Sequence, residues 1–129
     1  MRTMAKLKQK QTTPSMGGSG PVTNNLAPLV IRMAGHAESQ LELAMNSVMR
    51  RDAAGAAKVP PGDQVLDELQ QRIDQQAQIA LMADRPTQAD LNEILGAMRI
   101  AADLERIGDY AANISKRVQP LAQFTDLPQ

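Results

Sequence analysis

The stretch from Gln88 to Val118 most constrains the fold, because it contains no proline and keeps apolar residues at helical spacing throughout. Its early apolar stripe consists of Leu91, Ile94, Leu95 and Met98, and its later stripe of Ile100, Leu104, Ile107, Ala111, Ile114 and Val118. At about 100° per residue the two stripes lie on different sides of one helix, and we take the later one as the core face. Such a helix needs neighbours on both sides. We expect it to begin at a capping box formed by Thr87 and Asp90 and to end at Pro120.

Two further helices are predicted upstream of this stretch. Apolar residues recur every three or four positions across residues 26–48, and residues 23–25 offer side chains that can cap the start. Residues 53–62 are expected to form a connection, because the Pro60-Pro61 pair disfavours helical geometry. The next helix then begins with Asp63 as its N-cap, and a short break before the last helix makes the two antiparallel. The sequence therefore predicts an all-α fold, an antiparallel three-helix bundle.

Composition predicts one small helical domain with a tail at each end. Residues 1–22 carry four basic side chains and no acid among Gly, Ser and Pro, so we expect a flexible basic N-terminal tail that does not bind nucleic acid. Residues 23–120 would form the bundle and residues 121–129 a C-terminal tail.

The chain has no cysteine and one histidine, His36, which excludes thiolate and multi-histidine metal sites within one chain. A cytoplasmic location is expected, since neither a bilayer-spanning run nor a secretory signal is recognisable.

Glu105 and Asp109 are the leading candidate site residues, because residues four apart lie one turn apart on the same helix face. Two ionised carboxylates at this spacing repel, and a hard cation between them would turn repulsion into attraction. Gly108 lies beside them. An interior glycine costs about 1 kcal/mol relative to alanine, which is tolerated more readily where a neighbouring helix or an ion must approach the backbone. The alternative is a solvated face, with Arg106 forming an ordinary ion pair to Asp103 or Asp109.

Two other acidic pairs have the same spacing. Asp63 and Asp67 fall at the start of the second helix, where capping alone would account for Asp63. Glu38 and Glu42 fall beside the apolar stripe of the first helix, and we interpret them as a solvent-exposed flank.

Residues 103–114 read Asp-Leu-Glu-Arg-Ile-Gly-Asp-Tyr-Ala-Ala-Asn-Ile and closely resemble the signature of the PhoU family of phosphate-uptake regulators. The resemblance extends over roughly residues 26–118 and implies the same three-helix architecture. It also implies a metal ion bound by Glu105 and Asp109, with Asp63, Asp67 and Asn113 as further candidate ligands. The ion would be divalent or ferric: iron, zinc, manganese or magnesium.

The resemblance implies a regulator rather than an enzyme. Its partners would be the phosphate ABC transporter and the associated sensor histidine kinase, and membrane contact would come only through them. It would hold phosphate-starvation signalling off when phosphate is sufficient. Two alternatives remain: a metal-free structural adaptor, and a carboxylate-bridged metalloenzyme of the ferritin-like kind. Ferritin-like enzymes bind their metals through Glu-x-x-His pairs, and in this chain the residue three positions before His36 is Met33 instead of a glutamate.

A homodimer is also expected. PhoU proteins usually contain two repeats, whereas this chain shows one, and a second apolar stripe on its last helix would stay exposed in a monomer. Met98 is predicted to lie in that contact.

Overall fold

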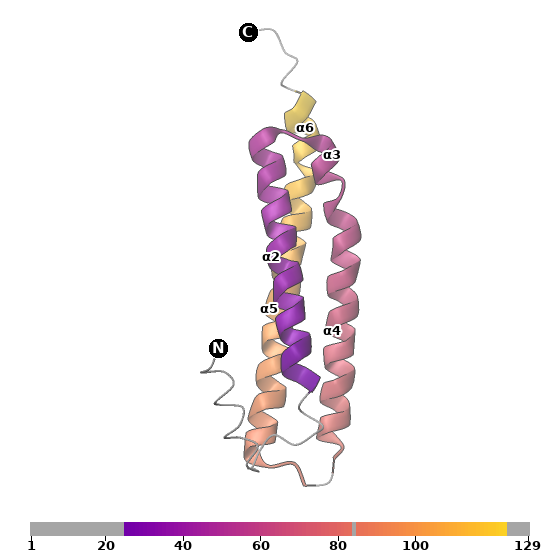
Figure 1. The fold of residues 1–129 in the computed structure, drawn as a ribbon, viewed down its shortest axis with the longest axis vertical. Helices are drawn as coiled ribbons and strands as arrows, with labels where there is room; N and C mark the ends of the chain where they lie inside the picture. Colours follow the sequence, from indigo (N-terminus) through magenta and orange to yellow (C-terminus); the bar gives the residue numbers. More distant parts are fainter. Residues whose placement is uncertain (1–24, 84, 124–129) are drawn as a thin grey trace.

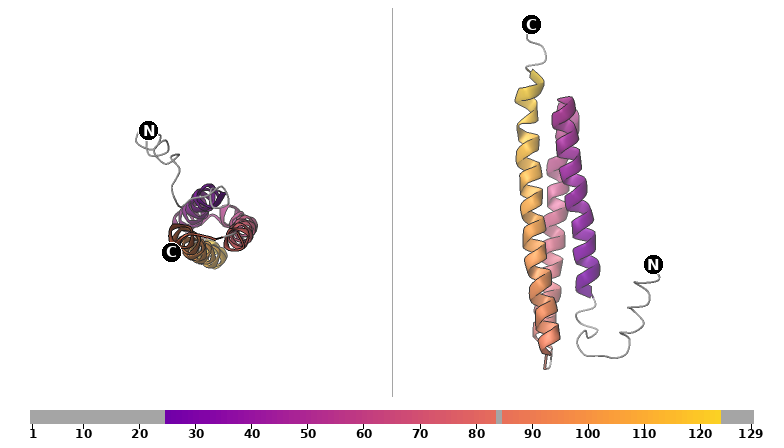
Figure 2. Two further views of the ribbon diagram at one scale, coloured as in Figure 1. Left: turned by 90° about the horizontal axis from the view of Figure 1, so that it is seen from below. Right: turned by 90° about the vertical axis from the view of Figure 1, so that its left-hand side faces the viewer.

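The computed structural model describes residues 25–83 and 85–123, which form three long helices and two short ones (Figure 1). The long helices are α2 (Leu26–Arg50), α4 (Val59–Leu81) and α5 (Gln88–Lys116). The short helices α3 (Ala53–Ala56) and α6 (Val118–Gln123) contact each other at one end of the bundle. α2 and α5 run parallel, α4 runs antiparallel to both, and the end-on view shows the three around a common axis (Figure 2). The described residues contain no strand, so the predicted all-α three-helix bundle is confirmed.

Buried residues recur three and four positions apart along each long helix, the spacing of helices that pack side by side at a small angle. The main core cluster contains Leu26, Leu29, Met33, Ala37, Leu66, Leu69, Ile73, Ala77, Ala80, Ile94, Ala97 and Ala101. A smaller cluster of Ala44, Val59 and Ala111 lies closer to the end occupied by α3 and α6.

The core face of α5 differs in part from the predicted one. Ala101, Gly108 and Ala111 are buried, whereas Ile100 is 49% exposed and Ile107 is only partly buried. Small residues face the neighbouring helices because they allow the backbones to approach closely, whereas Ile107 packs against the edge of the main core cluster and Ile100 faces solvent.

α4 begins at Val59, within the region predicted to be a connection, and Pro60 and Pro61 lie in its first turn. Proline fits there because the first N–H groups of a helix have no intrahelical acceptor. Lys58 occupies the N-cap position without a side-chain hydrogen bond, and Asp63 lies inside the helix. The prediction of Asp63 as the N-cap is therefore wrong, and capping does not account for this carboxylate.

The start of α5 is as predicted, because the Thr87 side chain accepts from the Asp90 N–H and the Asp90 side chain accepts from the Thr87 N–H. Its end is not. α5 stops at Lys116, and Pro120 lies in the first turn of α6 instead of terminating a helix. The predicted N-terminal tail, residues 1–22, lies outside the described residues. Of the predicted C-terminal tail, residues 121–123 belong to α6, and residues 124–129 lie outside the described residues.

Candidate metal centre

Four carboxylates meet where α4 packs against α5. Asp63 and Asp67 lie one turn apart on α4, and Glu105 and Asp109 lie one turn apart on α5. Asp63, Glu105 and Asp109 each place an oxygen within 4.8 Å of the other two. Asp67 adjoins this group, since its carboxylate acts on Glu105. We call these four residues the carboxylate cluster.

Gly108 allows the two helices to approach at this point. A Cβ atom placed on Gly108 would overlap Leu66 Cδ1 and would lie 3.2 Å from Asp63 Oδ1. Leu66 is completely buried, so its side chain has little freedom to move aside. Gly108 therefore allows α4 to pack closely against α5, which is one of the two roles predicted for it. The same close packing brings Asp63 to the carboxylates of α5.

The cluster holds more negative charge than its surroundings stabilise. The pKa of Glu105 is raised to about 8, first by burial, then by a side-chain hydrogen bond with Asp67 and by the negative charges of Asp67, Asp109 and Asp63. Burial also raises the pKa of Asp63, helped by Asp67 and Asp109, while the ammonium group of Lys116 acts in the opposite direction. The raised pKa of Glu105 favours its protonated form at neutral pH in the metal-free protein, and a bound cation would displace that proton.

Two oxygen atoms of the cluster are left without partners. Asp63 Oδ1 and Glu105 Oε1 are buried and accept no hydrogen bond from any described residue. A buried polar atom without a partner costs about 1–3 kcal/mol, and coordination of an ion would remove that cost. The donor set consists of carboxylate oxygens alone, which suits magnesium, manganese or iron better than zinc, whose closed sites use Cys and His. The residues present therefore fit a hard cation.

The surface ion pair considered as an alternative exists, but it does not involve the cluster. Arg106 Nη1 lies 3.2 Å from Asp103 Oδ1, and both side chains are more than half exposed. Asp109 instead belongs to the cluster.

Asn113 stays a predicted ligand on the same helix as Glu105 and Asp109, and the other polar residues considered lie on α2. Asn113 is exposed one turn beyond Asp109, and its backbone carbonyl accepts from Arg117 at 3.2 Å. His36, Glu38 and Glu42 are exposed on α2, which agrees with the interpretation of that acidic pair as a solvated flank. Lys116 lies on the same face of α5 as Glu105 and Asp109, and only the packing of α4 against α5 makes it the cationic neighbour of Asp63.

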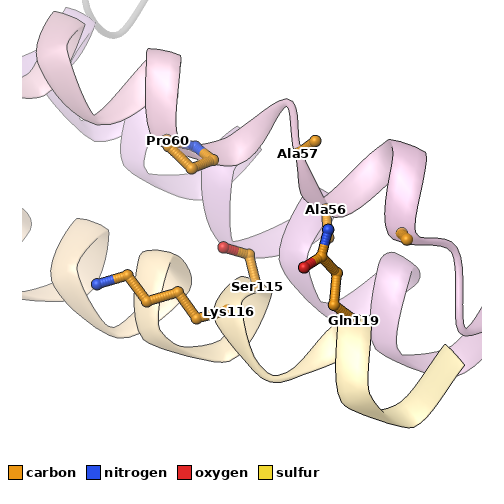
Figure 3. Close-up of a pocket in the computed structure, with 7 residues that line it drawn as sticks. Ala56, Ala57, Pro60, Ser115, Lys116 and Gln119 are labelled. Carbon is orange, nitrogen blue, oxygen red and sulfur yellow. The ribbon is translucent and has the colours of Figure 1, made fainter. Parts of the chain in front are cut away.

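A small recess of about 210 Å³ lies between α3, the start of α4, the end of α5 and the start of α6 (Figure 3). Its lining residues are Ala53, Ala56, Ala57, Pro60, Ser115, Lys116 and Gln119. The Ser115 hydroxyl donates to the carbonyl of Ala112 at 2.8 Å, so it is already used within α5. Figure 3 shows the Lys116 side chain extending away from Gln119. The lining of the recess contains no carboxylate, so it provides no oxygen ligand of the kind that the cluster provides.

Comparison with known proteins relates the chain to a single family. The family profile described as "PhoU domain" matches residues 30–118. A phosphate-specific transport system accessory protein PhoU homolog of Xylella fastidiosa (strain Temecula1) is 43% identical over 106 residues, which cover 82% of this chain and 44% of that protein. A protein of the same name from Rhizobium meliloti (strain 1021) is 38% identical over 93 residues, covering 72% of this chain and 39% of that protein.

The chain thus spans less than half the length of the curated relatives it matches. No solved structure matches it at a significant level. Within residues 25–83 and 85–123, every helix is too short or too polar to cross a bilayer.

Proposed function

The chain belongs to the PhoU family, and we propose that it is a cytoplasmic, metal-dependent regulator of phosphate uptake and phosphate-starvation signalling. The observation that supports the metal-dependent part is the carboxylate cluster, which includes two buried oxygens without partners. Support for the regulatory part comes from relatives that are named accessory proteins of a phosphate-specific transport system. The role is that of an accessory protein rather than an enzyme.

Glu105, Asp109 and Asp63 would hold the ion, with Asp67 completing the set. The bound ion would supply positive charge that neutralises the cluster and joins α4 to α5 at this point. Because the ion replaces repulsion between the two helices with attraction, it would stabilise the bundle by mass action. We propose that this stabilised form contacts the phosphate ABC transporter and its sensor histidine kinase.

The metal assignment is tested by replacing Glu105 and Asp109 together with alanine. Elemental analysis of the purified variant should show loss of bound metal, while circular dichroism shows unchanged helicity. The matched control is the Glu38→Ala and Glu42→Ala pair, which has the same spacing on an exposed face of α2. Full metal stoichiometry in the Glu105 and Asp109 variant would show that the assignment is wrong.

The regulatory part is tested in a bacterial host that lacks its own regulator of this family. Expression of the chain should lower a phosphate-starvation reporter when phosphate is abundant, and the Glu105 and Asp109 double variant should have a weaker effect. If the soluble, abundant protein leaves the reporter unchanged, the chain is better described as a structural helical adaptor.

A further inference from the structure

Basic side chains gather at the end of the bundle where α3 and α6 meet (Figure 1). This end carries five of the ten Lys and Arg side chains of the described residues, and only one of their twelve Asp and Glu side chains. All five are exposed, and we call them the basic end: Arg50, Arg51, Lys58, Lys116 and Arg117. The remaining described residues have an excess of acid, so charge is separated along the length of the bundle.

The topology brings these cations together from three separate segments. Arg50 and Arg51 lie at the end of α2. Lys58 directly precedes α4, and Lys116 and Arg117 lie at the end of α5. Because α4 is antiparallel to α2 and α5, it begins at the end of the bundle where they stop. The cations therefore surround one end instead of following one helix face.

The positive charge of this end is not neutralised by ion pairs. Among residues 25–83 and 85–123, no carboxylate oxygen lies within 4.0 Å of any of the five cationic groups, and the ion pair found there joins Arg106 to Asp103. Arg117 donates to the backbone carbonyl of Asn113 at 3.2 Å, a contact that holds the side chain and leaves its charge uncompensated.

Two neighbouring acids reduce the positive charge only in part. Asp52 lies at the basic end, and its Oδ1 accepts from the Gly55 N–H at 3.0 Å, so this carboxylate caps α3. The ammonium group of Lys116 opposes the rise in the pKa of Asp63, so the carboxylate cluster balances part of the charge of Lys116. The excess of positive charge is therefore carried mainly by Arg50, Arg51, Lys58 and Arg117.

The surface between the cations is formed by small and apolar side chains. α3 contains only Ala and Gly, and Ala54 is exposed on it. Met49, which precedes Arg50, is 78% exposed, and Pro120 is exposed in the first turn of α6. A blunt end of this kind can approach a flat surface closely, with the long basic side chains around its border.

We infer that the basic end docks on the surface of a membrane rich in anionic phospholipid. Charge complementarity identifies this occupant, because headgroup phosphates form a broad layer of negative charge that can meet cations from three segments at once. One basic side chain near such a surface increases partitioning about fivefold. Met49 is the one large, strongly exposed apolar side chain at this end, so binding is weak, reversible and screened by salt.

An acidic peptide or a nucleic acid fits this end less well. The recess beside α3 measures about 210 Å³, below the usual range for a ligand pocket, and most of its lining residues are alanine or proline. No aromatic side chain on which a base could stack lines the recess.

Docking on lipid would hold the chain at the surface in which its proposed partner, the phosphate transporter, lies. That role rests on the proposed function. The docking itself does not, because vesicles that contain no protein are sufficient to test it.

Co-sedimentation with vesicles tests the docking. The full chain should bind vesicles of mixed phosphatidylglycerol and phosphatidylcholine and should not bind pure phosphatidylcholine, in the presence of a chelator so that no metal ion joins the carboxylate cluster to headgroups. The Arg50→Gln, Arg51→Gln and Lys58→Gln triple variant should lose about a hundredfold in partitioning, at about fivefold for each cation. Circular dichroism should show unchanged helicity.

The matched control removes the same charge elsewhere. Arg32, Arg72 and Arg99 are exposed cations outside the basic end, and their replacement by Gln should leave binding close to that of the unmodified chain. Residues 1–22, with four basic side chains, are present in both variants. An equal loss in both variants would overturn the inference, as would absence of binding by the unmodified chain at low salt. Tighter binding to a short DNA duplex than to the vesicles would also overturn it.

A second measurement tests which end meets the lipid. The chain has no cysteine, so an environment-sensitive fluorophore on a single introduced cysteine reports one position. Its emission should shift to shorter wavelength on anionic vesicles when attached to Met49→Cys. The same fluorophore on Ile79→Cys should not respond, because Ile79 is 53% exposed near the opposite end of α4. Binding with a shift at Ile79→Cys alone would show that another surface meets the lipid.

Discussion

Replacing Gly108 with alanine should destabilise the bundle even though alanine is the better helix former. The new Cβ would overlap Leu66 Cδ1 and stand 3.2 Å from Asp63 Oδ1. Overpacking of a close-packed interior costs about 1–3 kcal/mol, and the intrinsic gain from glycine to alanine in a helix is about 1 kcal/mol. The expected net loss is therefore about 1 kcal/mol, and α4 and α5 should be pushed apart beside the carboxylate cluster.

Gly96→Ala is the matched control, because Gly96 also lies inside α5 and a Cβ atom there meets nothing within 4 Å. This variant should gain about 1 kcal/mol, so the difference between the two variants isolates the overpacking cost, about 2 kcal/mol. With a urea m-value of about 1–2 kcal/mol per M, the unfolding midpoints should separate by about 1–2 M.

Metal content supplies a second readout, since only Gly108→Ala should lower affinity for the ion by displacing Asp63. Equal stabilisation by both substitutions would refute the close approach of the helices at Gly108.

Four other substitutions probe the carboxylate cluster, the start of α5 and the contact between α2 and α4. Because the pKa of Glu105 is raised to about 8, the folded metal-free protein binds more protons than the unfolded chain between about pH 4.5 and 8. The free energy of unfolding should therefore fall as pH rises through this window. Glu105→Gln should make the stability less dependent on pH, as measured by thermal unfolding at a series of pH values. Thr87→Ala removes half of the capping box and should cost about 1 kcal/mol in urea unfolding. The new Cβ atom in Gly62→Ala should overlap the Gln40 amide and lower the free energy of unfolding by about 1–3 kcal/mol. Adding Gln40→Ala should recover part of this loss, because it removes the side chain that the new Cβ atom meets. If the changes in unfolding free energy of the two single variants simply add in the double variant, the contact between the two residues is contradicted.

Much of the local structure could be predicted from the sequence. The periodicity of apolar residues determined that the chain forms three long helices, and Thr87 with Asp90 determined where α5 starts, because a capping box acts within one turn. The spacing of Glu105 and Asp109 likewise determined that they share a face. These features depend on residues three or four apart, so the geometry of a single helix is sufficient to derive them.

Only the tertiary structure decided how the helices are rotated and aligned against one another. Periodicity favoured a face of α5 that includes Ile100, but close packing buries Gly108 and Ala101 and leaves Ile100 half exposed. The role of Asp63 changed for the same reason: its position after two prolines made it a helix cap, whereas the earlier start of α4 places it beside Glu105 and Asp109. The rotation and register of each helix are set by contacts between residues far apart in the chain, and no spacing within one helix specifies them.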